Sequence, residues 1–365
     1  MSKPFCSLPW TGIHVNQELN VYYCCIMAQD GNQLGNLKNN TLEEILSSPA
    51  AVEVRKEFID GVIPKRCQYA CGTRTGTIIS DLTITEQNNI LKEQRTDYLR
   101  VHSADIRSSN LCTLDCVYCS SLWSSTIAQR DNEPWMIVDA ERMRTYQGYI
   151  SNIDLTNCRR LYLAGGEPLL MKEYVAILQH VLEHNPECSV EVNTGLSVLN
   201  TPVYRLLSKL KNVTWIVSVD STDPAQFEYI RHGNTWKNFI NNLEIIKSNP
   251  DHVVTAHSVY FLLSYSKFDQ TLRDLADLGV SVIHIDPVSH PVLDVRNLPN
   301  IVPDAKAKLD QCLAEGLITE QKYVYLLNRL SEPASFSESV HDYLETMNKK
   351  YNMNSRNIFP ELYTE

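Results

Sequence analysis

Cys112, Cys116 and Cys119 stand close together in the sequence Cys-Thr-Leu-Asp-Cys-Val-Tyr-Cys. A predicted strand at 99–106 precedes them, so the three thiols are expected on one loop. Three thiolates on one loop can hold three corners of a cubane iron–sulfur cluster and leave the fourth iron open. The alternative is a zinc site, which needs a fourth ligand such as His102 or a distant cysteine.

The cysteine count favours metal binding over disulfides. The chain has 365 residues and 11 cysteines, and its first residues contain no apolar stretch typical of an export signal. An odd number of cysteines without such a signal indicates a reducing compartment, so we expect a cytoplasmic protein. No apolar stretch is long enough to cross a membrane. The net charge is −10 without a basic block, so no nucleic-acid partner is indicated.

From about residue 97, six predicted strands alternate with predicted helices. This alternation predicts an α/β fold with a parallel sheet, either doubly wound or an incomplete (β/α)6 barrel. The strands are expected at 99–106, 159–164, 188–193, 213–220, 252–262 and 281–286. The helices are expected at 137–150, 172–184, 202–210, 224–248 and 267–278, followed by a helical tail at 302–331 and 336–352.

The first 75 residues differ from this pattern. Residues 13–15 and 19–24 are predicted to be two short strands around a polar turn. Thr41-Leu-Glu-Glu44 is a capping box that opens a helix, interrupted at Pro49 and ending at Gly61. Because this small domain has a thin core, a metal site would help to hold it.

The three-cysteine motif, with the aromatic Tyr118 before its last cysteine, resembles the signature of the radical S-adenosylmethionine (SAM) superfamily. The second predicted strand runs into Gly165-Gly166-Glu167-Pro168, which is similar to the family's motif for the SAM amino group. On its own this motif can also be an ordinary turn. The resemblance implies a 4Fe–4S cluster that binds SAM and cleaves it to a 5′-deoxyadenosyl radical, within an incomplete (β/α)6 barrel.

Further positions resemble the family's SAM pocket. Asn193 ends the third strand, and Ser218 and Asp220 end the fourth, where the family places residues near the SAM ribose. Arg231 and Asn238 resemble a helix pattern that follows this strand, and Arg231 is expected to be either a carboxylate partner or a surface residue. All these positions fall at the C-terminal ends of strands or just beyond them, where parallel α/β folds bind ligands.

A second set of cysteines resembles the auxiliary-cluster modules called SPASM and twitch. Four thiolates would ligate a 4Fe–4S cluster fully, and the alternative is a structural zinc. Because adjacent residues of a strand face opposite sides, only one of Cys24 and Cys25 is expected to be a ligand, and Cys24 is favoured. The module here precedes the barrel, and its four candidate ligands suggest one auxiliary cluster, as in the shorter twitch type. The expected ligands are Cys6, Cys24, Cys67 and Cys71.

Other polar residues are candidate substrate contacts or satisfied polar groups at the barrel edge. Cys158, Cys188 and Cys312 fit neither cysteine set and are expected to be buried thiols. Strand alternation places His284 and Asp286 on one face. The candidates for general acid–base roles are His257, Tyr260, His284 and Asp286, with His290 and Glu191 in similar positions.

Together these observations predict an auxiliary-cluster domain at 1–80, a radical SAM barrel at 95–290 and a helical extension at 291–365. The predicted function is hydrogen abstraction by a SAM-derived radical. The substrate is expected to be a peptide, a protein or a small molecule, and the electron donor a flavodoxin- or ferredoxin-type protein. The competing hypothesis is a non-enzymatic iron–sulfur electron carrier or structural zinc protein, in which the Gly-Gly-Glu-Pro and Ser-x-Asp motifs would have no use.

Overall fold

The computed structural model describes residues 4–29, 31–67, 77–333 and 339–363. The chain divides into two compact units. The first contains Met1–Asn110, Val138–Val192 and Asn200–Val213, and the second contains Leu111–Ile137, Asn193–Leu199 and Thr214–Glu365. Among the helices of the described residues, none combines the length and the apolar composition that a bilayer crossing requires.

The predicted alternation of strand and helix is confirmed. Six strands follow one another from residue 103, with at least one helix after each of the first five. β6, β7 and β8 pair in parallel, as do β10 and β11. The strands are β6 (Ser103–Ile106), β7 (Arg160–Leu163), β8 (Ser189–Thr194), β9 (Val213–Ser218), β10 (His252–Tyr260) and β11 (Ser281–Pro287). The helices are α7 (Ser125–Arg130), α8 (Ala140–Ile150), α9 (Tyr174–His184), α10 (Pro202–Leu207), α11 (Pro224–Ile230), α12 (Trp236–Lys247) and α13 (Phe268–Asp277).

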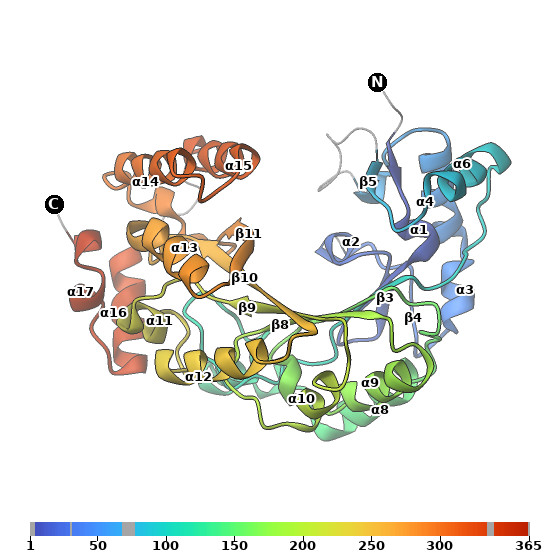
Figure 1. The fold of residues 1–365 in the computed structure, drawn as a ribbon, viewed down its shortest axis with the longest axis horizontal. Coiled ribbons are helices and arrows are strands. Elements are labelled where there is room, and N and C mark those ends of the chain that lie inside the picture. The colour runs from blue at the N-terminus through green and yellow to red at the C-terminus, as the bar shows by residue number, and fades with distance from the viewer. Residues whose placement is uncertain (1–3, 30, 68–76, 334–338, 364–365) are drawn as a thin grey trace. The chain divides into compact units, whose positions relative to one another are not determined.

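The N-terminal strands of the first unit extend its parallel sheet. β2 (Gly12–Val15) pairs in parallel with β6, and β3 (Asn20–Tyr22) and β4 (Gly35–Asn36) follow it in antiparallel pairing. The strand order within this unit is β8-β7-β6-β2-β3-β4, and α8 and α9 lie along one side of the strands (Figure 1). The pairing of β2 with β6 joins the N-terminal residues to the barrel strands. The compact units therefore do not follow the predicted domain boundaries at residues 80 and 95. Those domain boundaries stay a prediction.

One buried arginine ties the N-terminal helices together. The capping box at Thr41 opens α3 (Leu42–Leu46), and Pro49 begins α4 (Pro49–Ile59), as predicted. Arg55 of α4 is fully buried and donates hydrogen bonds to the carbonyls of Pro9, Leu46 and Thr96, at 2.7, 2.6 and 2.6 Å. A buried charge with several carbonyl partners fixes the segments that supply them.

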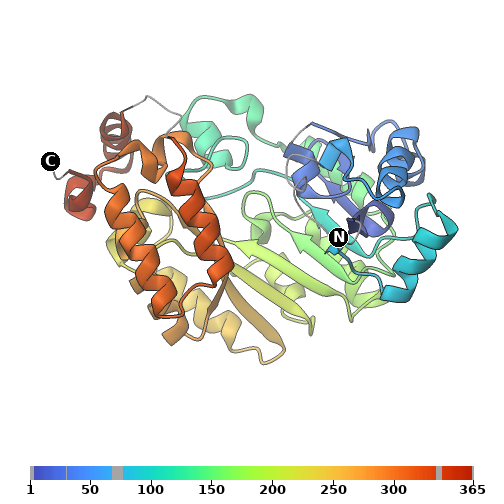
Figure 2. The same ribbon diagram turned by 90° about the horizontal axis from the view of Figure 1, so that it is seen from above.

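The helical tail of the second unit packs against the loop that carries the three cysteines. Tyr343 and Tyr351 of α16 donate hydrogen bonds to the carbonyls of Val117 and Asp115, at 2.6 and 2.7 Å. Helices α14 and α15 lie side by side (Figures 1 and 2). The tail therefore supports the loop through hydrogen bonds as well as apolar contacts. Its helices are α14 (Val302–Ala314), α15 (Glu320–Ser331), α16 (Val340–Tyr351) and α17 (Ser355–Ile358).

We expect Arg55→Met to destabilise the first unit by about 3–5 kcal/mol, because three buried carbonyls lose a charged donor. Urea denaturation measures the loss. Lys56→Met, at an exposed neighbour on the same helix, is the control and should change the stability little. Equal stabilities for the two variants would contradict the role given to Arg55.

Candidate functional site

The cysteine loop follows β6 and precedes α7 in the chain. Cys116 is buried and the other two cysteines are partly buried. The amides of Asp115 and Val117 donate to the carbonyls of His232 and Ile230, at 2.8 and 3.0 Å. Burial raises the pKa of the Cys116 thiol to about 12. Since thiolates are the ligand form, a metal that binds here displaces the proton.

Asp220 holds the cysteine loop through hydrogen bonds. Its carboxylate is buried, and one oxygen accepts hydrogen bonds from the Tyr118 hydroxyl at 2.9 Å and the Arg231 Nε at 2.8 Å. The other oxygen accepts the amide of Val259 at 2.8 Å. The Arg231 guanidinium also lies over the Tyr118 ring at 5.2 Å and reaches the Cys116 sulfur at 4.0 Å. Asp220 therefore orders the cysteine loop through Tyr118 and Arg231.

A glycine permits a close backbone approach to the same loop. Gly233 has φ +100°, and a Cβ atom there would lie 2.8 Å from the Thr113 carbonyl oxygen. Such a contact is too short for any side chain, so residue 233 has to be glycine while the loop keeps this position. The sequence prediction assigned no role to Gly233.

Asparagines just before and within α12 fix the turn that follows β8. Asn234, Asn238 and Asn242 donate to the carbonyls of Gly195, Ser197 and Leu196, at 3.1, 3.0 and 2.9 Å. Asn234 precedes the helix, and the spacing of four residues places Asn238 and Asn242 on one face of α12. Asn238, quoted only for its resemblance to the family, thus has a defined structural role.

Asn193 and Ser218 are in contact with each other. The Ser218 hydroxyl donates to Asn193 Oδ1 at 3.1 Å. Both lie at the C-terminal ends of their strands, which is the edge where parallel α/β folds bind ligands.

In the first unit, the Gly-Gly-Glu turn follows β7. Gly165 has φ +132°, and a Cβ there would lie 2.8 Å from the Ser109 carbonyl oxygen, which also accepts the amide of Gly166 at 3.1 Å. Glu167 is buried, and one of its carboxylate oxygens accepts the amide of Leu169 at 3.3 Å. The turn is therefore held rigidly, as a ligand-binding turn requires.

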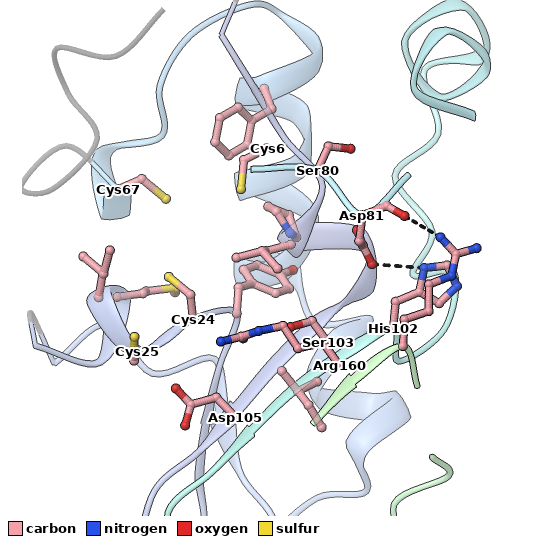
Figure 3. A pocket seen from close by; sticks show the side chains of 18 residues that line it. Cys6, Cys24, Cys25, Cys67, Ser80, Asp81, His102, Ser103, Asp105 and Arg160 are labelled. Carbon is pink, nitrogen blue, oxygen red and sulfur yellow. Dashed lines mark hydrogen bonds and ion pairs between the residues drawn. The ribbon is translucent and has the colours of Figure 1, made fainter. Parts of the chain in front are cut away.

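Cys6, Cys24, Cys25 and Cys67 line one cavity of about 440 Å³ in the first unit, mostly among apolar side chains. Figure 3 shows Cys6, Cys24 and Cys67 around this hollow. Cys71, the fourth predicted ligand, lies outside the described residues.

The prediction that Cys24 and Cys25 lie on a strand was wrong. β3 ends at Tyr22, and Cys25 begins the short helix α2 (Cys25–Gln29). Strand alternation therefore does not separate the two thiols, and both line the cavity. Burial, together with the neighbouring Asp105 carboxylate, raises the pKa of Cys25.

His257 and Asp286 form a pair in the second unit. His257 Nε2 lies 3.1 Å from an Asp286 carboxylate oxygen, and the His284 ring stands edge-on to His257 at 5.7 Å. The hydrogen bond with His257 lowers the pKa of Asp286. Tyr260 points elsewhere: it is buried and its hydroxyl donates to the Ala305 carbonyl at 3.0 Å. Three of the four acid–base candidates therefore come together and Tyr260 does not.

The remaining candidates are accounted for by local contacts. Cys158, Cys188 and Cys312 are buried free thiols, and Cys158 neighbours Cys188. His290 packs against Tyr343, with ring centres 4.9 Å apart. His102 is the alternative zinc ligand. Its Nδ1 lies 3.0 Å from an Asp81 carboxylate oxygen, and its Nε2 accepts a hydrogen bond from Arg100 Nε at 2.5 Å.

Two family models match this chain. The model of the radical SAM superfamily matches residues 106–275, and that of the iron–sulfur cluster-binding SPASM domain matches residues 6–72. Residues 106–275 of this chain belong to the radical SAM superfamily. A radical SAM cyclopropyl synthase, TigE of Paramaledivibacter caminithermalis, is 27% identical over 183 residues, which cover 47% of this chain and 37% of that protein. The chain thus matches well under half the length of this curated relative.

Solved radical SAM structures resemble the chain at low identity. The structure of anSMEcpe with bound AdoMet is 16% identical, with a TM-score of 0.42, and the match covers 56% of this chain and 57% of that chain. Streptococcus suis SuiB bound to S-adenosylmethionine is 13% identical, with a TM-score of 0.43, and the match covers 74% and 62%.

The donor sets fit the clusters that a radical SAM protein with a SPASM module requires. Cys112, Cys116 and Cys119 offer three thiols, which would hold three irons of a 4Fe–4S cluster and leave the fourth iron open. In the described residues no three His, Cys, Asp or Glu side chains are arranged to hold a single metal ion. A cubane cluster takes one thiolate per iron, so its ligands do not converge on one point.

We expect Asp220→Asn to destabilise the second unit by about 3–5 kcal/mol, because it leaves the buried Arg231 without its counter-charge. Iron bound by the three-cysteine loop should fall with it. Urea denaturation and iron analysis measure the two effects, and Asp251→Asn, at an exposed position, is the control. A variant that matches this control in both measurements would remove Asp220 from the role described.

Proposed function

We propose that the chain is a radical SAM enzyme that cleaves S-adenosylmethionine reductively and uses the resulting 5′-deoxyadenosyl radical to abstract a hydrogen atom from its substrate. The observation that carries this proposal is the cysteine loop, which supplies three thiols and is held by Asp220, Arg231 and Tyr118. Its position inside the segment that matches the family supports the same reading.

The chain's own residues have distinct parts in this proposal. Gly165, Gly166 and Glu167 bind the methionyl end of SAM, in a turn held against the Ser109 carbonyl. Ser218 and Asp220 lie near its ribose, and Asn193, which Ser218 contacts, is a further SAM-binding residue.

Asp220 has a second part in this proposal. Its two oxygens accept three hydrogen bonds, two of them from Tyr118 and Arg231, so it also positions these two residues.

The auxiliary cluster occupies the cavity among Cys6, Cys24 and Cys67, with Cys71 as its fourth ligand. Cys25 is the alternative to Cys24. A fully ligated 4Fe–4S cluster has no open iron, so its part is to accept an electron from a substrate radical or to bind substrate.

The substrate is a peptide, a protein or a small molecule, and a flavodoxin- or ferredoxin-type protein supplies the electron. The name of the relative TigE, a cyclopropyl synthase, supports a synthetic reaction. His257 and Asp286 are the proposed acid–base pair for the substrate. Cys158, Cys188 and Cys312 are buried free thiols, and such thiols support a cytoplasmic location because they persist in a reducing compartment.

Iron and nucleoside analysis test the proposal. After anaerobic reconstitution the chain should bind about eight irons, and replacing Cys112, Cys116 and Cys119 by Ala should leave about four. The unaltered chain should release 5′-deoxyadenosine from SAM and dithionite, and the variant should release none. Cys312→Ala, a buried thiol outside both sets, is the control. Zinc in place of iron, or no 5′-deoxyadenosine, would favour the electron-carrier or structural-zinc alternative.

A further inference from the structure

A row of polar side chains crosses the sheet of the first unit at one register. His14 of β2, Asp105 of β6, Tyr162 of β7 and Glu191 of β8 are direct neighbours on successive strands. Residues at one register of adjacent parallel strands face the same side. Strands inside a parallel sheet are ordinarily apolar on both faces, so charges at this place require a functional explanation.

Two arginines complete the row. Arg160 donates from Nε and Nη2 to the two oxygens of Glu191, at 2.8 and 2.6 Å. Arg107 donates in the same way to Asp105, at 3.0 Å for both bonds. Their guanidinium groups lie 5.2 and 5.9 Å from the ring centre of Tyr162. Bidentate pairs of this kind hold their charges at fixed positions.

Arg160, unlike Arg107, lines the auxiliary cavity, which is the cavity among Cys6, Cys24, Cys25 and Cys67. It lines this cavity together with Cys6, Cys24 and Cys67 (Figure 3). Its side chain is 44% exposed, and its hydrogen bonds to Glu191 use only Nε and Nη2. Arg159, the other arginine at the cavity, donates to the backbone carbonyl of Asp81.

The opposite charge at the cavity wall is already neutralised. Asp105 also lines the cavity, and it is paired with Arg107 and with His14 Nδ1 at 3.2 Å. Burial raises the pKa of Asp105, but the hydrogen bond from His14 and the charge of Arg107 outweigh burial and lower it to about 2. Arg160 therefore adds a positive charge beside the cysteines that Glu191 offsets in part, and the charge of Arg159 lies at the same cavity.

We propose that Arg160 raises the reduction potential of the auxiliary cluster and that Glu191 moderates this effect. The inference rests on the proposed function, because it presumes a cluster in this cavity. One-electron reduction makes a thiolate-ligated cluster more negative, and a nearby positive charge stabilises the reduced form. Arg160 thus favours electron acceptance by the cluster through its positive charge, without ligating iron.

The test is a potentiometric titration of the auxiliary cluster, followed by electron paramagnetic resonance. The full-length chain with Cys112, Cys116 and Cys119 replaced by Ala serves as parent, so that only the auxiliary cluster is observed. Arg160→Gln should lower the midpoint potential and Glu191→Gln should raise it. Arg160→Lys keeps the charge and should stay close to the parent. Arg205→Gln, on α10 and away from the cavity, is the control and should match the parent.

Each outcome decides between the two claims. Opposite shifts for Arg160→Gln and Glu191→Gln support the proposal. Shifts no larger than that of the control, or shifts in the same direction, overturn it, even where the parent retains a normal cluster. A parent without an auxiliary cluster signal overturns the proposed function itself and the inference with it. If Arg160→Gln loses its iron, Glu191→Gln and Arg160→Lys still decide the matter.

Discussion

A single buried carboxylate organises the part of the chain that carries the chemistry. Asp220 connects three segments by hydrogen bonds. It contacts the cysteine loop at Tyr118, the C-terminal end of α11 at Arg231, and β10 at the amide of Val259. The Asp220 side chain is fully buried and that of Arg231 is 11% exposed, so water competes little for these hydrogen bonds. The loop therefore has one low-energy position, and Gly233 and the α16 tyrosines, which approach it from other directions, depend on that position.

Both cysteine sets share one feature, which is that ordered polar contacts hold the backbone around them. In the first unit Arg55 connects three segments by their carbonyls, one of them Pro9 beside the cavity. In the second unit Asp220 has the equivalent part. Since cluster binding requires deprotonated thiols in fixed places, a scaffold that is ordered before binding lowers the entropy cost of assembly.

Local patterns in the sequence predicted local structure well. The capping box at Thr41 and the alternation of strands and helices each follow from hydrogen bonding and burial within a few residues. Long-range features were missed because they depend on contacts between residues far apart in the sequence. The pairing of β2 with β6 depends on backbone groups that no side-chain pattern marks. Gly233 was missed because a loop glycine acquires its meaning only from the carbonyl opposite it. Tyr260 is three residues from His257 on one strand, so strand alternation already places the two on opposite faces.

The measurement that tests the account most directly is electron–nuclear double resonance of the reduced chain with SAM labelled at its methionyl nitrogen and carboxylate. The account predicts hyperfine coupling of both labels to the cluster at Cys112, Cys116 and Cys119, because SAM binds the one iron without a cysteine. A reduced cluster with no coupling to either label would contradict it.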